Sequence, residues 1–197
     1  MRPAYYFNVR VATEATARGP AGFAIDVIAK LLKAVHAICE QKKIQFASAF
    51  PQARNGDHFH PGTVLRVFVE TRDAADDIGD ALEANTFLAG YIHVGRIRVS
   101  PLEGVSSVSY ERFRISSRKS VKPEHRLRRL AEGDSLPYLK IASASNGEGF
   151  SLRFKVVQHS QAPSSEIEPN GYGLSVSTRS FRLPEINDDT SPWAKQI

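Results

Sequence analysis

The stretch that decides the fold is residues 22–41, GFAIDVIAKLLKAVHAICEQ. Its apolar residues recur at intervals of three and four with charged residues between them, as on an amphipathic helix. The flanking residues 5–11 and 44–50 alternate apolar and polar or outward positions, which predicts a half-buried strand on each side of the helix. The inward positions are Ala24, Ile28, Leu31, Leu32, Val35 and Cys39 on the helix, and Tyr5, Phe7, Val9, Val11, Ile44, Phe46 and Phe50 on the strands.

A second set of elements follows this first one. Residues 64–70 predict a strand, residues 73–85 a shorter helix with Ile78 and Leu82 inward, and residues 91–99 another strand. The order βαββαβ is that of the ferredoxin-like or RRM-like α+β domain, which many RNA-binding proteins use. The aromatic RNP1 string of RRM domains is missing from the sequence, so we do not expect RNA bases to stack on the sheet in the RRM manner.

The remainder predicts a smaller second half. Strands are expected at residues 138–143 and 150–157, with a surface loop at 160–170 and a glycine-rich stretch at 171–175. We therefore divide the chain into a ferredoxin-like domain at 1–102, a C-terminal half with an arginine-rich helix at 103–186, and a tail at 187–197. The sequence has no apolar run of membrane-spanning length and no export signal, so we expect a cytoplasmic protein without membrane contact.

The positive charge of the chain is concentrated at residues 112–129. Eight basic residues and a single acid, Glu124, lie there, whereas the whole chain has a formal net charge of +5. The segment ends in the helix-like run PEHRLRRL at 123–130. Such a strip is typical of proteins that bind polyphosphates, although a solvated basic face or a disordered arm has the same composition. Its basic residues are Arg112, Arg114, Arg118, Lys119, Lys122, Arg126, Arg128 and Arg129.

His36 lies at the margin of the apolar stripe of the first helix. Imidazole accepts a proton near neutral pH, so a histidine held there suits a general base; the alternative is a half-buried structural histidine. His58 and His60 could bind a metal, but no third ligand of fixed spacing accompanies them, and a plain loop is the simpler interpretation. With no phosphate-binding glycine loop or paired cysteines present, we expect neither a cofactor nor a metal.

Four pieces of sequence have a familiar order and spacing. They are KAVHA at 33–37 with SAFP at 48–51, RLRRL at 126–130, LPYLKIASASNGEGF at 136–150, and YGLS at 172–175. With them the chain, from about residue 5 to 184, resembles the type I-F CRISPR-associated endoribonuclease that processes the repeat transcript into guide RNAs. The resemblance implies that the partners are the repeat RNA hairpin and the other subunits of a type I-F-like effector complex.

The resemblance also implies a catalytic set of His36, Ser143 and Tyr172. His36 would take the proton of a ribose 2′-hydroxyl, Ser143 would hold that hydroxyl, and Tyr172 would orient the imidazole. Cleavage at the base of the hairpin by this route needs no metal and yields a 2′,3′-cyclic phosphate and a 5′-hydroxyl. The processed guide would stay bound.

The same resemblance assigns the other site residues to RNA binding. Phe150 would stack on the closing base pair, Arg114 would read a guanine, and the arginine-rich helix would grip the hairpin chiefly through its phosphates. Ser116 or Ser117 stands where the family has a base-reading glutamine, and only residues 131–135 separate the arginine run from Leu136, so we expect a truncated helix. The RNA-binding set is Arg112, Arg114, Ser116, Arg118, Lys119, Lys122, Arg126, Arg128, Arg129 and Phe150.

Two other classes of function remain open at this point. One is a hairpin-binding subunit of a CRISPR surveillance complex that does not cleave RNA. The other is a basic ribosomal or DNA-binding protein, whose binding would be sensitive to salt and indifferent to a hairpin.

Overall fold

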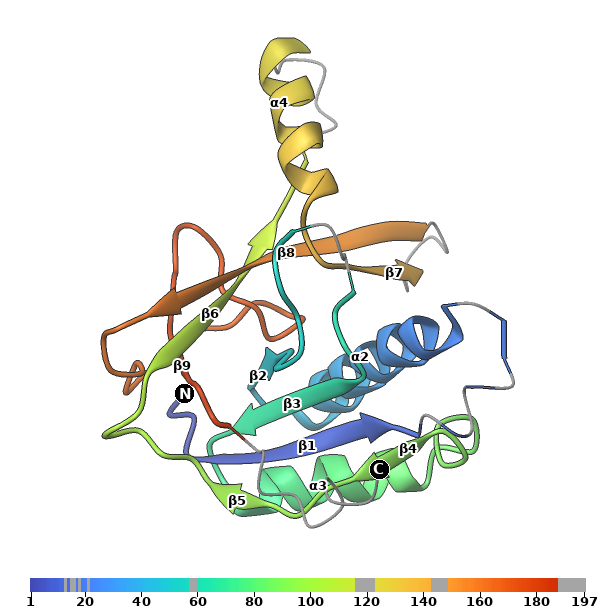
Figure 1. Ribbon diagram of the computed structural model, residues 1–197. Coiled ribbons are helices and arrows are strands. Elements are labelled where there is room, and N and C mark those ends of the chain that lie inside the picture. The colour runs from blue at the N-terminus through green and yellow to red at the C-terminus, as the bar shows by residue number, and fades with distance from the viewer. Residues whose placement is uncertain are drawn as a thin grey trace.

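A computed structural model describes residues 1–12, 14, 17, 19–20, 22–56, 60–115, 123–142 and 149–187. These residues form two antiparallel sheets and the helices α2, α3 and α4, which confirms the α+β class (Figure 1). Within the described part of the chain, no helix combines the length and the apolar character needed to cross a membrane.

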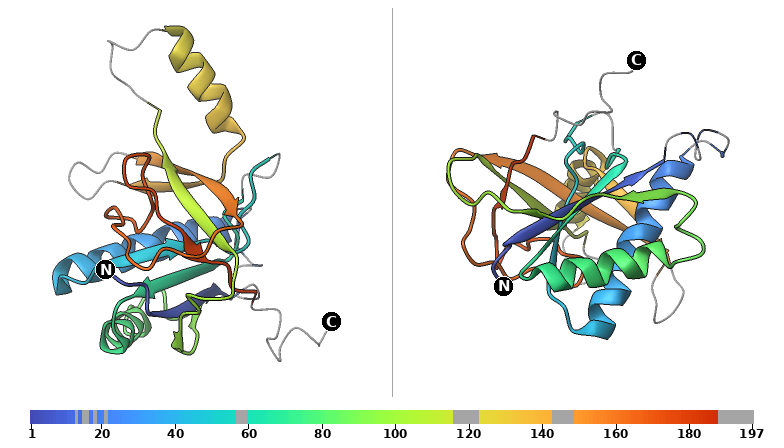
Figure 2. Two further views of the ribbon diagram at one scale, coloured as in Figure 1. Left: turned by 90° about the vertical axis from the view of Figure 1, so that its left-hand side faces the viewer. Right: turned by 90° about the horizontal axis from the view of Figure 1, so that it is seen from below.

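The first sheet has the strand order β2-β3-β1-β4, and β5 also pairs with β1. Helices α2 and α3 lie on the same face of this sheet (Figure 2). Helix α2 also contacts β7 of the second sheet, so it connects the two halves of the molecule. The elements are β1 Tyr5–Val11, α2 Phe23–Lys42, β2 Phe46–Ala49, β3 Val64–Val69, α3 Arg72–Glu83, β4 Ile92–Val94 and β5 Arg98–Val99.

The prediction of one continuous strand at 91–99 is wrong, because the pairing with β1 shifts by one residue between β4 and β5. The Gly95 backbone N–H donates a 2.7 Å hydrogen bond to the Asn8 carbonyl oxygen. A Cβ atom at Gly95 would lie 2.9 Å from that same oxygen, closer than carbon and oxygen pack. Glycine therefore lets the backbone approach β1 here, at the expense of strand continuity.

The second sheet has the order β7-β8-β6-β9. Its strand β6 was not expected, because Ser107 and Ser109 alternate in it with Val108 and Tyr110 and all four residues are buried, so the strand has no single apolar face. Ser107 donates a 2.6 Å hydrogen bond to the Gln161 carbonyl oxygen, and Ser109 donates one of 2.7 Å to that of Phe181, which satisfies both buried hydroxyls. The strands are β6 Ser107–Phe113, β7 Tyr138–Ala142, β8 Gly149–His159 and β9 Leu183–Pro184.

The core is shared by the two sheets. Phe50, which follows β2, stacks on Phe154 of β8 with a ring-centroid distance of 4.6 Å, and Tyr110 of β6 packs edge-on against both. One cluster of buried apolar residues contains side chains from both sides of residue 102. Burial of these rings fixes how the two sheets are placed relative to each other.

Helix α4, Pro123–Asp134, projects from the body of the protein (Figures 1 and 2). It does not stop after the arginine run but continues through residues 131–134. Gly133 is buried in its last turn, where a Cβ atom would lie 3.0 Å from Ile115 Cδ1. The helix can therefore pack closely against the end of β6 at this point.

Candidate functional site

The structure brings His36 and Tyr172 into contact, although they are far apart in the sequence. Their ring centroids are 4.9 Å apart and the ring planes are inclined by 41°. The His36 side chain is 29% exposed and faces a cavity of about 220 Å³, which Gly171 also lines. Its Nε2 lies 3.8 Å from Oε2 of Glu40, one helical turn further on. His36 is thus a half-exposed histidine packed against an aromatic ring. It lies at the margin of the apolar face of α2, as the sequence predicts.

Tyr172 is held by a tight loop. The Asn170 side-chain oxygen accepts a 2.8 Å hydrogen bond from the Tyr172 backbone N–H, and the Asn170 carbonyl oxygen accepts one of 2.8 Å from Gly173. The Gly173 carbonyl in turn accepts a 2.8 Å hydrogen bond from the Ser48 N–H in β2. Gly173 has φ +75°, and a Cβ atom there would lie 2.5 Å from the Ser48 nitrogen. Only glycine fits this position.

The far end of the loop is bound to the second sheet. Ser175 N donates to the Tyr110 carbonyl at 3.0 Å, and Arg112 N donates to the Ser175 carbonyl at 2.8 Å. The loop that carries Tyr172 is therefore hydrogen-bonded to β2 on one side and to β6 on the other. This arrangement fixes the ring against His36 without a direct hydrogen bond between the two side chains being needed.

Phe150 and Arg112 extend the cluster around Tyr172. The Phe150 ring centroid is 6.1 Å from that of Tyr172, and the Arg112 guanidinium carbon lies 5.7 Å from the same Tyr172 centroid. Burial, with the nearby charge of Arg114, lowers the pKa of Arg112 below its usual value, while Tyr172 acts in the opposite direction. An arginine remains charged at neutral pH even so, and it supplies a cation beside Tyr172.

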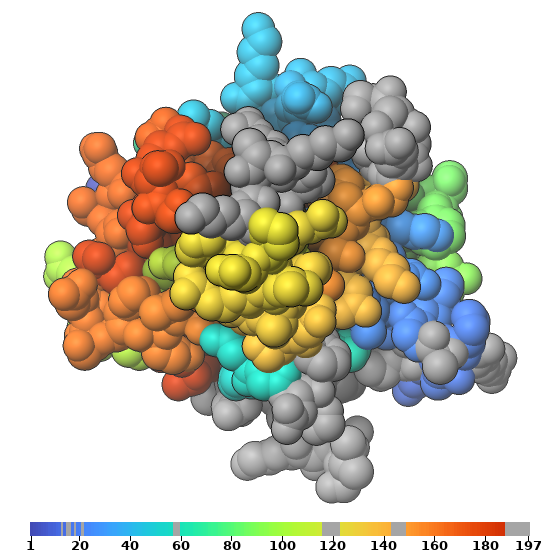
Figure 3. Space-filling model, turned by 90° about the horizontal axis from the view of Figure 1, so that it is seen from above, coloured from blue at the N-terminus to red at the C-terminus, as the bar shows by residue number. Residues whose placement is uncertain are grey.

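Two predicted site residues lie on the exposed part of α4. Arg126 and Arg128 are exposed, and Leu127 between them is 65% exposed. Seen from above, the atoms of α4 occupy the centre of this face, in front of the residues of the second sheet (Figure 3). A helix that presents cations on a projecting surface is suited to contact with a polyanion larger than the protein's own clefts.

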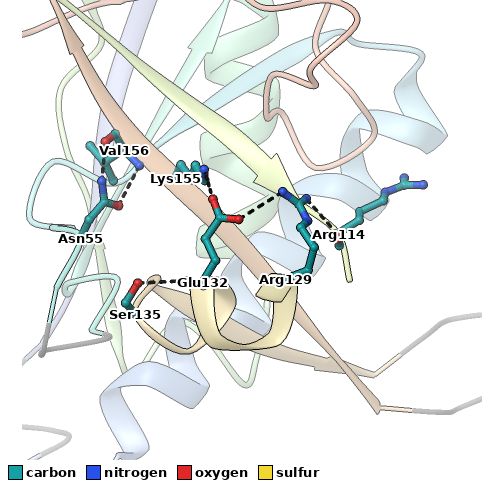
Figure 4. A network of polar contacts seen from close by, with 7 residues as sticks. All are labelled: Asn55, Arg114, Arg129, Glu132, Ser135, Lys155 and Val156. Atoms are coloured by element: carbon teal, nitrogen blue, oxygen red, sulfur yellow. Dashed lines mark hydrogen bonds and ion pairs between the residues drawn. The ribbon is translucent and has the colours of Figure 1, made fainter. Parts of the chain in front are cut away.

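Arg129 differs from its neighbours because its side chain makes contacts within the protein. These contacts lie at the root of α4, the C-terminal end by which the helix joins the body (Figure 4). The guanidinium donates to Glu132 at 3.5 Å and to the Arg114 carbonyl oxygen at 3.1 Å, and it lies 3.7 Å from the centroid of the Phe113 ring. Glu132 also pairs with Lys155 of β8. The hydrogen bond from Lys155 lowers the pKa of the Glu132 carboxyl. This network attaches α4 to β6 and β8.

The other predicted site residues cannot be placed. Ser143, Ser116, Arg118, Lys119 and Lys122 lie outside the described residues, as does His58 of the H-x-H pair, for which a plain loop is the simpler interpretation. His60, the other member, accepts a hydrogen bond from the Gly62 N–H at Nδ1, with a length of 2.8 Å. The described residues include no group of three or more histidine, cysteine or acidic side chains placed to hold a metal ion.

Sequence reasoning missed several residues that shape the site. Glu40 could have been found from its spacing of four residues from His36 on a helix. Asn170 and Gly173 carry only the general signal of turn-forming residues. Lys155 and Glu132 carry no sequence signal, because they pair between a strand and a helix that are separate in the sequence.

Comparison with known proteins gives a family and a structural likeness. The model of the family CRISPR-associated protein (Cas_Csy4) matches residues 20–181. A solved structure described as "An RAMP protein binding different RNA substrates" is similar with a TM-score of 0.40 and 13% identity, over 90% of this chain and 98% of that one. No curated protein matches. Because the family model covers most of the sequence, the chain belongs to the Cas_Csy4 family, the type I-F CRISPR repeat-processing endoribonucleases.

Proposed function

We propose that this protein cuts CRISPR repeat RNA at the base of its hairpin, without a metal, using the 2′-hydroxyl beside the scissile phosphate as the nucleophile. The contact between His36 and Tyr172 carries the proposal, because it holds a half-exposed imidazole in a defined orientation. In-line attack requires such a fixed base, since reaction depends on the placement of the reacting atoms.

His36 is the general base in this proposal and takes the proton of the 2′-hydroxyl. Ser143 follows directly after the last residue of β7 and would hold this hydroxyl in place. Tyr172 is a positioning residue, which acts through the imidazole. The products are a 2′,3′-cyclic phosphate and a 5′-hydroxyl, because the attacking oxygen remains bonded to phosphorus while the 5′-oxygen leaves and takes up a proton from water.

The remaining residues would bind the hairpin. Phe150 would offer a ring for the closing base pair, and Arg112 would neutralise a phosphate near the cut; the positions of both residues beside Tyr172 support these roles. Arg126 and Arg128 on α4 would contact stem phosphates. Arg114, with Ser116, Arg118, Lys119 and Lys122, would complete the basic surface. Arg129 would contribute mainly by holding α4 in position, which its contacts support.

We extend the proposal to the setting of the enzyme. The strand order β4-β1-β3-β2 and the element order βαββαβ support a ferredoxin-like arrangement of the first half, with residue 102 as its end. The enzyme would act on transcripts in the cytoplasm, retain the guide hairpin, and join the other subunits of a type I-F-like effector complex through it.

One experiment tests the proposal. Wild type and His36→Ala are incubated in EDTA with a repeat hairpin and with a linear RNA of the same composition. We expect the wild type to cut only the hairpin, and His36→Ala to lose about 10²- to 10⁴-fold in rate, as loss of a general base does, with its affinity nearly unchanged. Tight hairpin binding without cutting by the wild type would instead assign the protein to the non-cleaving subunits. Equal binding of both RNAs would point to a basic protein without hairpin preference.

A further inference from the structure

A second polar cavity lies between the two sheets. It has a volume of about 320 Å³, large enough for a small ligand, and its lining includes residues of β1 and β3 from the first sheet and of β6 and β8 from the second. No residue of α2 lines it, whereas α2 carries His36. It is therefore separate from the cavity beside the imidazole.

The lining of this cavity is cationic. Arg10, Arg54 and Arg66 line it, against one carboxylate among the described lining residues, Glu185. Both oxygens of Glu185 accept hydrogen bonds, one from the Ser106 hydroxyl at 2.7 Å and one from Gln158 at 3.2 Å. The carboxylate is thus held at the side of the cavity by neutral donors, and the cavity keeps a positive surplus.

Arg66 and Arg54 are hydrogen-bonded within the protein. Arg66 is 3% exposed, and its Nε and Nη1 donate to Asn8 Oδ1 at 2.8 Å and to the Ile186 carbonyl at 3.0 Å. Arg54 donates to the carbonyl of Pro51 at 2.9 Å. A guanidinium held in this way stays oriented when a ligand arrives, which lowers the entropic cost of binding an anion. Burial raises the pKa of Tyr110 to about 12, so its phenol stays neutral beside these charges.

The cavity is joined to the root of α4 by residues 53–56. The Gly56 N–H donates a 3.0 Å hydrogen bond to the carbonyl of Ser135, which directly follows α4. Asn55 exchanges two hydrogen bonds with the backbone of Val156, of 2.7 and 3.0 Å (Figure 4). Arg54 and Val156 both line the cavity. Arg54 therefore belongs to a segment that links the lining of the cavity to the end of α4.

We infer that this cavity binds a phosphate and its nucleoside from single-stranded RNA that flanks the hairpin. The inference rests on the proposed function, because α4 must bring the hairpin there. Guanidinium groups bond phosphate oxygens through paired donors. Gln52 and Gln158 also line the cavity; since Gln52 Oε1 accepts from Thr63 and Gln158 Nε2 donates to Glu185, the Gln52 nitrogen and the Gln158 oxygen are the groups that would meet a base or ribose. An acidic protein segment would use the cations but not this mixed polar lining.

Binding of three RNAs by the full chain tests the inference. They are the hairpin alone, the hairpin with a short single-stranded extension on its 5′ side, and the hairpin with one on its 3′ side. A 2′-deoxyribose before the scissile bond keeps each intact. We expect one extension to tighten binding by the wild type on the order of tenfold, as two added charge-assisted contacts would do. The responding side identifies the flank.

Variants then assign this gain to the cavity. Arg10→Gln with Arg54→Gln should lose the gain while binding the bare hairpin as before, and the slope of log K against log salt should fall by ~0.7 for each lost phosphate contact. Arg10→Lys with Arg54→Lys retains both charges but not the paired donors, so it should keep only part of the gain. Binding of the bare hairpin as tightly as by the wild type excludes misfolding as the cause of any lost gain. Lys30→Gln with Arg72→Gln removes the same charge from the helical face and should keep all of the gain.

Two results would overturn the inference while leaving the proposed function intact. One is a bare hairpin that binds tightly while neither extension adds affinity; the other is an unchanged gain in the Arg10→Gln, Arg54→Gln variant. Binding of a short polyglutamate peptide that this variant abolishes, with no effect of either extension, would assign the cavity to an acidic protein segment instead. If the wild type does not bind even the bare hairpin, the proposed function itself is wrong.

Discussion

Tyr172 contacts His36 through its ring. The ring should therefore matter more to the cleavage rate than the Tyr172 hydroxyl does. The centroid distance of 4.9 Å is a packing contact between the two rings. We therefore expect Tyr172→Phe to keep most of the single-turnover cleavage rate. Tyr172→Ala should lose up to about a hundredfold, because displacement of a catalytic group by about an ångström can have that effect.

Hairpin affinity measured on the same two variants separates orientation from binding. Both should bind the hairpin nearly as tightly as the wild type does. If Tyr172→Phe loses as much rate as Tyr172→Ala, the hydroxyl acts in the reaction and the ring contact does not explain the role of Tyr172.

At the scale of elements, the loop around Gly173 positions Tyr172, and its backbone is tightly constrained at Gly173. Gly173→Ala should destabilise the protein by more than the roughly 1–2 kcal/mol that a left-handed backbone costs a non-glycine residue, because the new Cβ would also meet the Ser48 backbone. Gly104 is the matched control: it has φ +71° with nothing within 4 Å of its Cβ position. Thermal melting should show a clearly larger drop in Tm for Gly173→Ala than for Gly104→Ala. Equal drops would mean that the contact with β2 is unimportant.

The stability that the contacts at the root of α4 confer should depend on pH through the carboxyl of Glu132. The pKa of this carboxyl is lowered in the folded protein, chiefly by the hydrogen bond from Lys155. Its contribution to stability is therefore present above its unfolded pKa, roughly 4.3, and is lost as the pH falls through the lower folded pKa. Glu132→Gln should lower Tm at pH 7, and this difference from the wild type should shrink as the pH falls below about 4.

A double-mutant cycle with Lys155→Met identifies the partner of Glu132. At pH 7 the two substitutions together should cost less than the sum of their separate effects. Additive effects, or a difference between wild type and Glu132→Gln that stays constant down to low pH, would contradict the ion pair.

The elements that could be predicted from sequence are those with a clean apolar period. Helix α2 is predicted at residues 22–41 and observed at Phe23–Lys42, because its buried face consists of aliphatic side chains and a cysteine. Strand β6 could not be predicted, because Ser107 and Ser109 are buried along with the core residues Val108 and Tyr110, and the serine hydroxyls find backbone acceptors only in the folded chain. The end of α4 was missed because Gly133, ordinarily a helix breaker, is needed there for close packing.

At the scale of the whole molecule, the two sheets share one core, and Cys39 of α2 lies in it. Burial raises the pKa of the Cys39 thiol to about 12, so it is a poor nucleophile in the folded state. We expect alkylation by iodoacetamide to be slow in native buffer and to rise with urea in parallel with the loss of circular dichroism. Rapid labelling of the native protein would mean that α2 opens locally, and that His36 is not rigidly held.

The candidate site is a property of the whole molecule, which limits what the residues alone could predict. His36 could be singled out from its place on a helical wheel, but its contact with Tyr172 requires both sheets and the loop between them. The role of Tyr172 came from resemblance to a family rather than from spacing. The cationic cavity could not be predicted at all, since Arg10, Arg54 and Arg66 come from separate elements and show no pattern in the sequence.

The central claim is that a ribose 2′-hydroxyl activated by His36 attacks the phosphate. The most direct test is the cleavage of a repeat hairpin in which a single 2′-deoxyribose replaces the ribose before the scissile bond. We predict that wild-type protein binds this RNA as tightly as the unmodified hairpin and leaves it uncut, while the unmodified RNA yields a 2′,3′-cyclic phosphate. Cleavage of the deoxy-substituted hairpin at the same bond would contradict the account.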